Sequence, residues 1–263
     1  MRISSLSQTL DHLSARLFAR HVVPFRLARP VISFTFDDYP RSALDLGGRI
    51  LESEGISATY YTAFGLARTG SPSGLIGSID ELAACVAAGH EIACHSYDHI
   101  DCRKAPAEEF ARNLDRNRKI ARDLGLPSLR HFAYPFGRYG MAGKRIAMES
   151  YASARTILWG VNRANIDLGL LKSVPIYSGS RSLRLASYLD GLSSRKGWLI
   201  LYTHDVSPRP SPYGCTPEEL YSVIHRARAM GALVLPVGAT VEKLHEAALR
   251  GRVAPSLTPA HLT

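Results

Sequence analysis

The stretch VISFTFDD, residues 31–38, decides the fold. Its first six residues are mostly apolar or β-branched, and two carboxylates, Asp37 and Asp38, follow them directly. We interpret this short run, which has no charged residue before Asp37, as a buried strand. It predicts a parallel sheet inside an α/β domain, with charged side chains at the carboxyl end of the strand.

The same arrangement of short strands and capped helices continues along the chain. Ser78 and Glu81 form a capping box that predicts a helix start, and Gly89 predicts its end. Further helices are expected over 42–53, over 106–125 and from Thr216 onward. Further strands are expected at 58–62, 91–94, 131–133, 152–157, 198–202 and 232–235. Such alternation implies a mostly parallel sheet with helices outside.

Polar residues follow four of these strands at the point where each strand ends. They are Asp37 with Asp38, His95 with His99, Pro135, and His204. In a closed barrel the carboxyl ends of all strands meet on one face, where active sites are built. An open sheet also binds ligands at its carboxyl edge, but the barrel is favoured. We therefore predict a distorted (β/α)7–8 TIM-like barrel that forms a single domain.

The chain is expected to have three parts. Residues 1–29 form an amphipathic helical appendage, 30–245 the catalytic domain, and 246–263 a flexible tail. The apolar positions of the appendage are Leu6, Leu10, Leu13, Leu17 and Phe18. Two roles remain open for this helix: packing on the domain's own surface, which is favoured, or a peripheral membrane or partner contact helped by Arg16 and Arg20.

Composition restricts the partners. The 263 residues carry a formal charge of +9, which favours anionic partners. The cations are interspersed with acids, so we expect no nucleic acid partner. With neither a membrane span nor the apolar core of a signal peptide, we expect a cytoplasmic location, with the inner face of the membrane as the alternative. Reduced thiols are expected at Cys85, Cys94, Cys102 and Cys215, and nothing marks an oligomeric state.

The segment His95-Ser96-Tyr97-Asp98-His99 places two imidazoles four residues apart. On one turn of helix they would share a face and could hold a metal ion, with Asp38 as third ligand and an open coordination position. A structural zinc site that includes Cys94 and Cys102 is the alternative. For the two aspartates, a solvated acidic turn is the alternative to a metal ligand beside a general base.

Together these motifs resemble the polysaccharide deacetylase family, also called the NodB homology family or carbohydrate esterase family 4. Thr35-Phe36-Asp37-Asp38 matches the TFDD motif, the histidine segment matches H(S/T)xxH, and Leu201-Tyr202-Thr203-His204 matches LxxH. The resemblance implies that Asp38, His95 and His99 ligate a divalent metal ion, zinc or else cobalt or nickel. It further implies that Asp37 is the base, that His204 is the acid, and that Leu201 lines the acetyl pocket.

The third motif of the family departs from its common form. Many members have an arginine that contacts the catalytic aspartate, whereas this chain reads Phe132-Ala133-Tyr134-Pro135-Phe136-Gly137, similar to an FAYP-G branch. Tyr134, Pro135 and Phe136 are expected near the substrate, with a backbone N–H near Phe136 at the oxyanion. We hypothesise that Arg155 supplies the missing guanidinium from the next strand; a surface arginine is the alternative. Asp205 is either an orienting partner of His204 or a turn residue.

The expected activity is removal of an N-acyl group, acetyl by preference, from an amino sugar in a glycan or glycan precursor of envelope or exopolysaccharide synthesis. Such a substrate could carry a phosphate or a lipid. A deformylase or another non-peptide amidohydrolase is a close alternative on the same fold. A non-catalytic carbohydrate-binding relic, with aromatic residues stacking on sugar rings, is the alternative from a different class.

Overall fold

A computed structural model describes residues 2–179 and 181–253. Its main sheet has eight strands, all paired in parallel, in the order β10-β11-β2-β3-β6-β7-β8, with β12 beside the start of β2. The strands are β2 (Val31–Asp37), β3 (Thr59–Thr62), β6 (Glu91–Cys94), β7 (His131–Ala133), β8 (Ser153–Arg155), β10 (Ser173–Pro175), β11 (Trp198–Thr203) and β12 (Leu233–Val234). The sheet is parallel, as predicted from the sequence, and seven of its strands coincide with predicted ones; β10 was not predicted.

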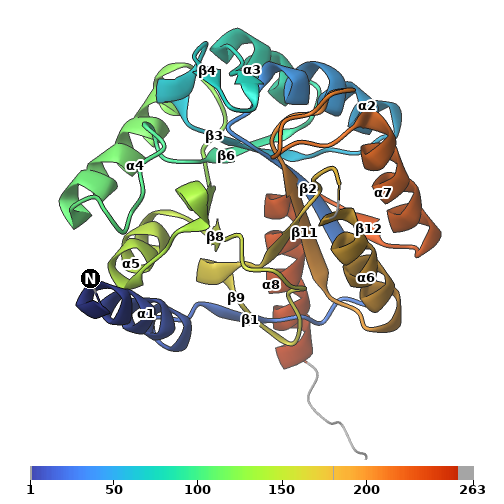
Figure 1. Ribbon diagram of the computed structural model, residues 1–263. Coiled ribbons are helices and arrows are strands. Elements are labelled where there is room, and N and C mark those ends of the chain that lie inside the picture. The colour runs from blue at the N-terminus through green and yellow to red at the C-terminus, as the bar shows by residue number, and fades with distance from the viewer. Residues whose placement is uncertain (1, 180, 254–263) are drawn as a thin grey trace, which may run out of the picture.

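The sheet curls into a nearly closed barrel. Its two outer strands, β8 and β10, are joined by a bridge between Arg155 and Leu171, just before β10 begins. The amide of Ser173 adds a hydrogen bond to the carbonyl oxygen of Leu158, 2.9 Å away. Figure 1 shows the strands around a common centre with the helices outside them. The predicted distorted (β/α)7–8 barrel is therefore confirmed.

The helices surround the barrel. They are α1 (Arg2–Leu17), η1 (Ala43–Gly48, a π-helix), α2 (Arg49–Ser53), α3 (Ile79–Ala87), α4 (Ala107–Asp123), α5 (Met141–Ser150), α6 (Arg181–Ser194), α7 (Pro217–Ala229) and α8 (Val237–Val253). Short 3₁₀ turns are η2 (Phe64–Leu66), η3 (Pro135–Gly137) and η4 (Leu168–Leu170). The predicted capping box at Ser78 begins α3, and Thr216 begins α7 in the same way. Among the described residues, no helix combines the length and apolarity that crossing a bilayer requires.

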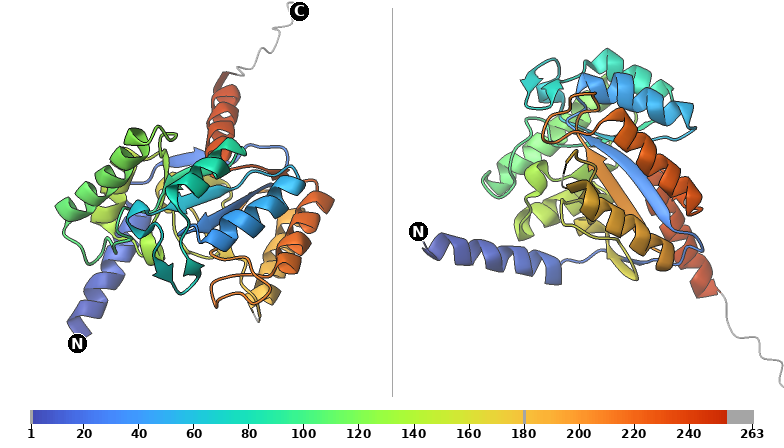
Figure 2. Two further views of the ribbon diagram at one scale, coloured as in Figure 1. Left: turned by 90° about the horizontal axis from the view of Figure 1, so that it is seen from above. Right: turned by 45° about the vertical axis from the view of Figure 1, so that its right-hand side comes forward.

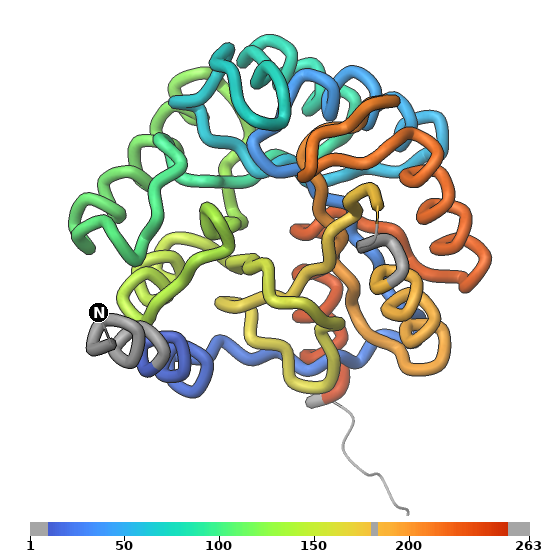
Figure 3. Tube along the Cα trace, in the orientation of Figure 1, coloured from blue at the N-terminus to red at the C-terminus, as the bar shows by residue number. Residues whose placement is uncertain are grey.

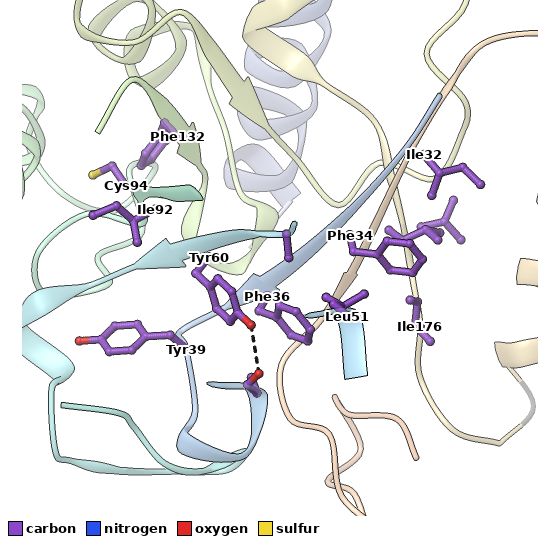
Figure 4. Close-up of a cluster of buried hydrophobic side chains, with 14 of the residues drawn as sticks. Ile32, Phe34, Phe36, Tyr39, Leu51, Tyr60, Ile92, Cys94, Phe132 and Ile176 are labelled. Atoms are coloured by element: carbon purple, nitrogen blue, oxygen red, sulfur yellow. Dashed lines mark hydrogen bonds between the residues drawn. The ribbon is translucent and has the colours of Figure 1, made fainter. Parts of the chain in front are cut away.

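Side-chain alternation separates an outer core from a more polar barrel interior. Phe34 and Phe36 of β2 point outward and pack with Tyr60 and Leu51 under the helices (Figure 4). Ser33, Thr35 and Asp37 alternate with these phenylalanines. Their side chains belong to the opposite face of the strand and are also buried. The interior therefore holds hydroxyl and charged groups that the apolar outer layer shields from water.

Helix α8 covers the amino end of the barrel. Its first amides donate hydrogen bonds into the interior, Val237 N to Thr59 Oγ1 (2.9 Å) and Gly238 N to Glu91 Oε2 (3.1 Å). A carboxylate at a helix N-terminus satisfies amides that lack partners in the helix itself. With this end filled, ligands have access at the carboxyl end of the strands.

The expected boundaries need two corrections. Residues 1–29 are not helical throughout, because β1 (Val22–Pro24) pairs antiparallel with β9 (Asn165–Asp167). The trace in Figure 3 shows the part of the chain after α1 running along the barrel before it enters β2. The expected tail from residue 246 is also wrong up to residue 253, since α8 is helical as far as Val253; residues 254–263 lie outside the described part. Both expectations failed because the structure of these segments depends on contacts with residues that are distant in sequence.

Candidate functional site

The end of β2 presents two adjacent carboxylates in different surroundings. Asp37 is the last residue of the strand and is buried in the barrel mouth. Asp38 follows with a φ of 60°, a left-handed conformation that aspartate tolerates better than most residues. The turn directs Asp37 to Arg155 and Asp38 to the two histidines. The two acids can therefore perform different tasks.

His95 and His99 converge on Asp38. Their Nε2 atoms lie 3.8 Å and 3.5 Å, respectively, from Asp38 Oδ1. One ligand atom from each of the three residues lies within 4.8 Å of the other two, and no other such group occurs in the part of the chain that the structure describes. His95 Nδ1 lies 2.8 Å from the carbonyl oxygen of Ala133. Because that oxygen only accepts, Nδ1 carries the proton and Nε2 is free to ligate.

The donor set fits a divalent cation. Asp38 Oδ1 is buried and has no hydrogen-bond partner among the described residues. Burial, reinforced by Asp37, raises the pKa of Asp38 to about 6. Burial, reinforced by His99, lowers the pKa of His95 to about 3, so this imidazole is neutral near pH 7. An unsatisfied carboxylate oxygen beside two imidazole nitrogens is costly without a cation, and it is the donor set of an open zinc-type site.

The cysteines do not join this group. Cys94 Sγ accepts a hydrogen bond from Asn117, and the thiol of Cys102 donates to the carbonyl oxygen of Arg138. Cys94 precedes His95 and points into the outer core, so the strand alternation separates the thiol from the imidazole. The alternative of a structural zinc site with both cysteines is wrong. All four cysteines are free, as expected, and three of them are buried.

Arg155, at the end of β8, reaches Asp37 across the barrel. Its Nη2 donates to Asp37 Oδ1 at 2.5 Å, and its guanidinium lies 4.9 Å and 5.0 Å from the ring centroids of Tyr61 and Tyr202. Burial favours the neutral acid, but Arg155 and two nearby histidines outweigh it, and the pKa of Asp37 is lowered. Arg155 is buried, so the surface alternative is wrong and the hypothesised contact is confirmed. A catalytic contribution of this contact stays a prediction.

His204 follows β11 and lines the same cavity as the two aspartates. Its Nδ1 is buried and lacks a hydrogen-bond partner among the described residues. Asp205 does not orient it: the Asp205 carboxylate accepts from Ser211 N (2.8 Å) and Ser211 Oγ (2.5 Å). The turn-residue interpretation of Asp205 therefore holds. The loop it organises returns to the site, where Tyr213 O accepts from His204 N at 3.0 Å.

These side chains line a cavity of about 520 Å³ at the carboxyl end of the barrel. A small hairpin of β4 (Gly70–Ser71) and β5 (Gly74–Leu75) forms one wall. Aromatic and apolar side chains form much of the rest: Leu66, Tyr134, Phe136, Ile157, Tyr177, Tyr202 and Tyr213. A chamber with apolar walls and a few convergent polar groups is typical of a small-molecule site.

Leu201 does not line this cavity, contrary to expectation. It is fully buried in the outer core, opposite Phe34 of β2. Its neighbour Tyr202 lines the cavity instead, and so does His204. Because side chains alternate along a strand, residues 202 and 204 share the inner face that residue 201 cannot reach. The LxxH spacing locates the strand end correctly, but it does not give the direction of the leucine.

The segment after β7 shapes the opposite wall. Phe136 has a φ of 58° and packs its ring against His99, with the centroids 4.5 Å apart. Pro135 is buried at the start of η3. Tyr134 is mostly in the outer core, where its hydroxyl donates to the carbonyl oxygen of Gly169 at 3.1 Å. Phe136 is therefore the exposed aromatic residue that this segment presents to the cavity, and Tyr134 is chiefly a support.

Two asparagines missed in the sequence hold the histidine segment in place. Asn113 Oδ1 accepts from the amides of Tyr97 and Asp98, and its Nδ2 donates to Asp98 Oδ2 at 2.7 Å. One helical turn later, Asn117 bonds the ends of β3 and β6. Asparagine is unfavourable inside helices. Two of them four residues apart in a charged helix were the signal that could have revealed this support.

Comparison with known proteins agrees with this geometry. The sequence profile described as polysaccharide deacetylase matches residues 26–149, which include the aspartate, histidine and FAYP-G motifs but neither Arg155 nor His204. None of the curated proteins compared matches the chain.

Solved structures of carbohydrate esterase family 4 share the fold. The Streptomyces lividans family 4 esterase is 15% identical, with a TM-score of 0.54 over 78% of this chain and 91% of that chain. The Xyl-CE4 domain of a xylanase from the Trinervitermes trinervoides hindgut metagenome is 17% identical (TM-score 0.55; 87% and 94%). The peptidoglycan deacetylase PdaC of Bacillus subtilis is also 17% identical (TM-score 0.55; 86% and 98%). The profile match over residues 26–149 and the shared barrel agree with the resemblance of the motifs to the polysaccharide deacetylase family.

Proposed function

We propose that the chain is a metal-dependent hydrolase that removes an N-acyl group, acetyl in the simplest case, from an amino sugar. The observation that carries the proposal is the pairing of two sites in one cavity: the ligand set of Asp38, His95 and His99 beside the Asp37–Arg155 ion pair. An ionised acid adjacent to a cation site suits hydrolysis better than carbohydrate binding alone, because binding needs neither.

The metal ion would be held by Asp38, His95 and His99, as Zn²⁺ or else Co²⁺ or Ni²⁺. When bound, such an ion polarises a substrate carbonyl group and makes a water molecule more acidic. The neutral state of His95 and the unsatisfied Oδ1 of Asp38 support this assignment.

Asp37 is the proposed general base. Its lowered pKa keeps it ionised at neutral pH, and Arg155 fixes one carboxylate oxygen, which leaves the other to accept the proton of the attacking water. His204 is the proposed general acid that protonates the leaving amine, so that the C–N bond breaks and the acid and the free amine are released. Proton transfers of this kind contribute about 10²- to 10⁴-fold each.

The cavity suits a sugar ring. Tyr177, Tyr202, Tyr213 and the exposed ring of Phe136 surround the charged groups, and aromatic faces stack on apolar sugar faces. The charge of +9 favours a substrate that carries phosphate, as a lipid-linked or nucleotide-linked precursor of an envelope or exopolysaccharide would. The similar Streptomyces lividans structure contains acetate, which supports acetate as the released acid.

Acid release from N-acylated amino-sugar oligomers tests the proposal. The zinc-loaded protein is compared with the chelated protein and with Asp37→Asn, and both acetate and formate are measured. We expect acetate release that requires the metal ion and falls at least about 100-fold in Asp37→Asn. Release of formate from formylated sugars alone would indicate a deformylase. Sugar binding without acid release, in a fully metallated protein, would indicate the non-catalytic relic.

A further inference from the structure

Helix α1 attaches to the barrel through its polar side. Asp11 Oδ1 accepts from the amide of Met141 at 3.0 Å, and the ring of His12 packs on Tyr139 with the centroids 4.5 Å apart. Ala15 is fully buried, and its carbonyl oxygen accepts from Lys144 Nζ at 2.7 Å. These contacts fix the face of α1 that carries residues 11, 12 and 15 against α5 and its neighbours.

The apolar face of α1 points the other way. Leu10, Leu13 and Leu17 follow one another at helical spacing and are 60%, 49% and 59% exposed, and Phe18 just after the helix is 62% exposed. At about 100° per residue these leucines lie nearly opposite Ala15. The helix packs on the domain's own surface, as favoured, but it does so through residues 11, 12 and 15, and the described leucines stay exposed. The side chain of Leu6 lies outside the described part.

Cationic side chains border this apolar face. Arg16 and Arg20 are exposed, and together with Arg163 and Lys172 they line a cavity of about 200 Å³ beside the helix. The one carboxylate in its lining belongs to Asp167, which is already engaged by Lys144 Nζ at 2.7 Å. Four cations next to an apolar stripe attract an anionic surface.

Helix α1 also projects on the side of the barrel where the catalytic cavity lies. In the left view of Figure 2, α1 and α8 project from opposite sides of the barrel, and α1 projects on the side of the β4–β5 hairpin. That hairpin forms a wall of the catalytic cavity. A surface that binds α1 would therefore be on the same side of the molecule as the cavity.

We propose that α1 and the basic cavity beside it bind the surface of an anionic lipid bilayer. The exposed leucines and Phe18 would enter the boundary between headgroups and acyl chains, while Arg16, Arg20, Arg163 and Lys172 meet the phosphates. An apolar stripe flanked by arginines is the pattern of helices that lie in a membrane interface, whereas a stripe that packs on a protein partner needs no ring of cations. The inference does not depend on the proposed reaction.

Co-sedimentation of the full chain with lipid vesicles tests this inference. The probes are vesicles of phosphatidylglycerol mixed with phosphatidylcholine, and vesicles of phosphatidylcholine alone. We expect binding to the anionic vesicles that weakens as salt is raised. Replacing both leucines, Leu13→Asp with Leu17→Asp, should reduce the partition coefficient at least tenfold. Because both side chains face solvent, this variant should fold, which its thermal unfolding verifies.

Two further variants complete the test. Leu249→Asp is the matched control, since Leu249 is 62% exposed on α8, and its binding should equal that of the wild type. Arg16→Gln with Arg20→Gln should weaken binding to anionic vesicles and flatten its salt dependence. Equal binding of the leucine variant and the wild type, or no binding of the wild type to either vesicle, would overturn the proposal. A wild-type dimer in solution that the leucine variant dissociates would also overturn it, by assigning the stripe to a second copy.

Discussion

Both ends of the barrel interior hold an acid beside a histidine, but the two clusters are built differently: Asp37 is buried, whereas Glu91 is half-buried. At the amino end, Glu91 accepts from Thr59 Oγ1 (2.6 Å) and from the first turn of α8, and His131 Nδ1 lies 2.9 Å from Ser153 Oγ. None of these residues has a left-handed backbone, and none of their buried polar atoms lacks a partner among the described residues.

The carboxyl end has the opposite character. Asp38, Ser96, His99 and Phe136 all have positive φ values between 53° and 60°. Asp38 Oδ1 and His204 Nδ1 are buried without partners among the described residues. Strained backbone and unsatisfied polar atoms persist where function requires them. The difference therefore supports the proposal that the carboxyl-end cluster is the reactive site, and it indicates a structural role for the amino-end cluster.

The largest expected effect is a loss of kcat on replacing Asp37, which we do not expect on replacing Glu91. Asp37→Asn removes the proposed base and should lower kcat by about 10²- to 10⁴-fold at full metal occupancy. Glu91→Gln, the matched change at the amino end, should leave kcat within about twofold, since its effect falls on stability. Steady-state kinetics at measured metal content compares them. A large loss of kcat in Glu91→Gln would remove the distinction between the two ends.

A smaller loss of activity is expected for Arg155. Arg155→Ala leaves Asp37 buried without its ion pair, so we expect kcat to fall at least tenfold and stability to fall by about 3–5 kcal/mol. Arg155→Lys keeps the charge and should recover part of both. Kinetics and thermal unfolding of the two variants are compared at equal metal content. An unchanged kcat in Arg155→Ala would show that the ion pair is only structural.

The hydrogen bonds by which Asn113 supports the histidine segment, residues 95–99, should matter less than the Asp37–Arg155 ion pair. Asn113→Ala removes three hydrogen bonds to residues 97 and 98, and we expect metal affinity to fall by about 10- to 100-fold, as for other supports of metal ligands. Arg112→Ala, at an exposed position beside it, is the control and should leave affinity unchanged. Competition with a chromogenic chelator measures both. Equal affinities would show that the segment holds its shape without Asn113.

The smallest expected effect is a gain in the stability of the metal-free protein when Asp38 is replaced. The pKa of Asp38 is raised to about 6 in the folded chain, against about 3.9 when unfolded. Between these values the folded state binds more protons, so the metal-free protein loses stability as the pH rises from about 4 to about 6. Asp38→Asn should therefore stabilise the metal-free protein by about 1–3 kcal/mol at pH 7.5 and not near pH 4. Chemical unfolding with chelator present measures this; a destabilised variant at pH 7.5 would contradict it.

Much of the fold and of the site could be predicted because the information is local. The strand at residues 31–36 and its two aspartates, the paired histidines and the capping box at Ser78 are each visible within a few residues. Arg155 could be proposed because it lies in the next predicted strand after the third motif, which is β8 and pairs with β7.

The errors concern information that is not local. The inward or outward direction of Leu201 depends on the alternation of the whole strand, and the pairing of β1 with β9 joins segments more than 130 residues apart. The outward-facing leucines of α1 also could not be predicted from the local sequence. Amphipathicity predicts a helix, but only the contacts of Asp11, His12 and Ala15 show which side packs on the barrel.

The most direct test of the account is elemental analysis of bound metal after reconstitution with zinc and desalting. We predict about one ion per chain in the wild type, none in the double variant His95→Ala with His99→Ala, and about one in His131→Ala, the matched histidine change at the amino end. A wild type that retains no ion, or a double variant that retains as much as the wild type, would contradict the assignment of the carboxyl-end cluster as a catalytic metal site.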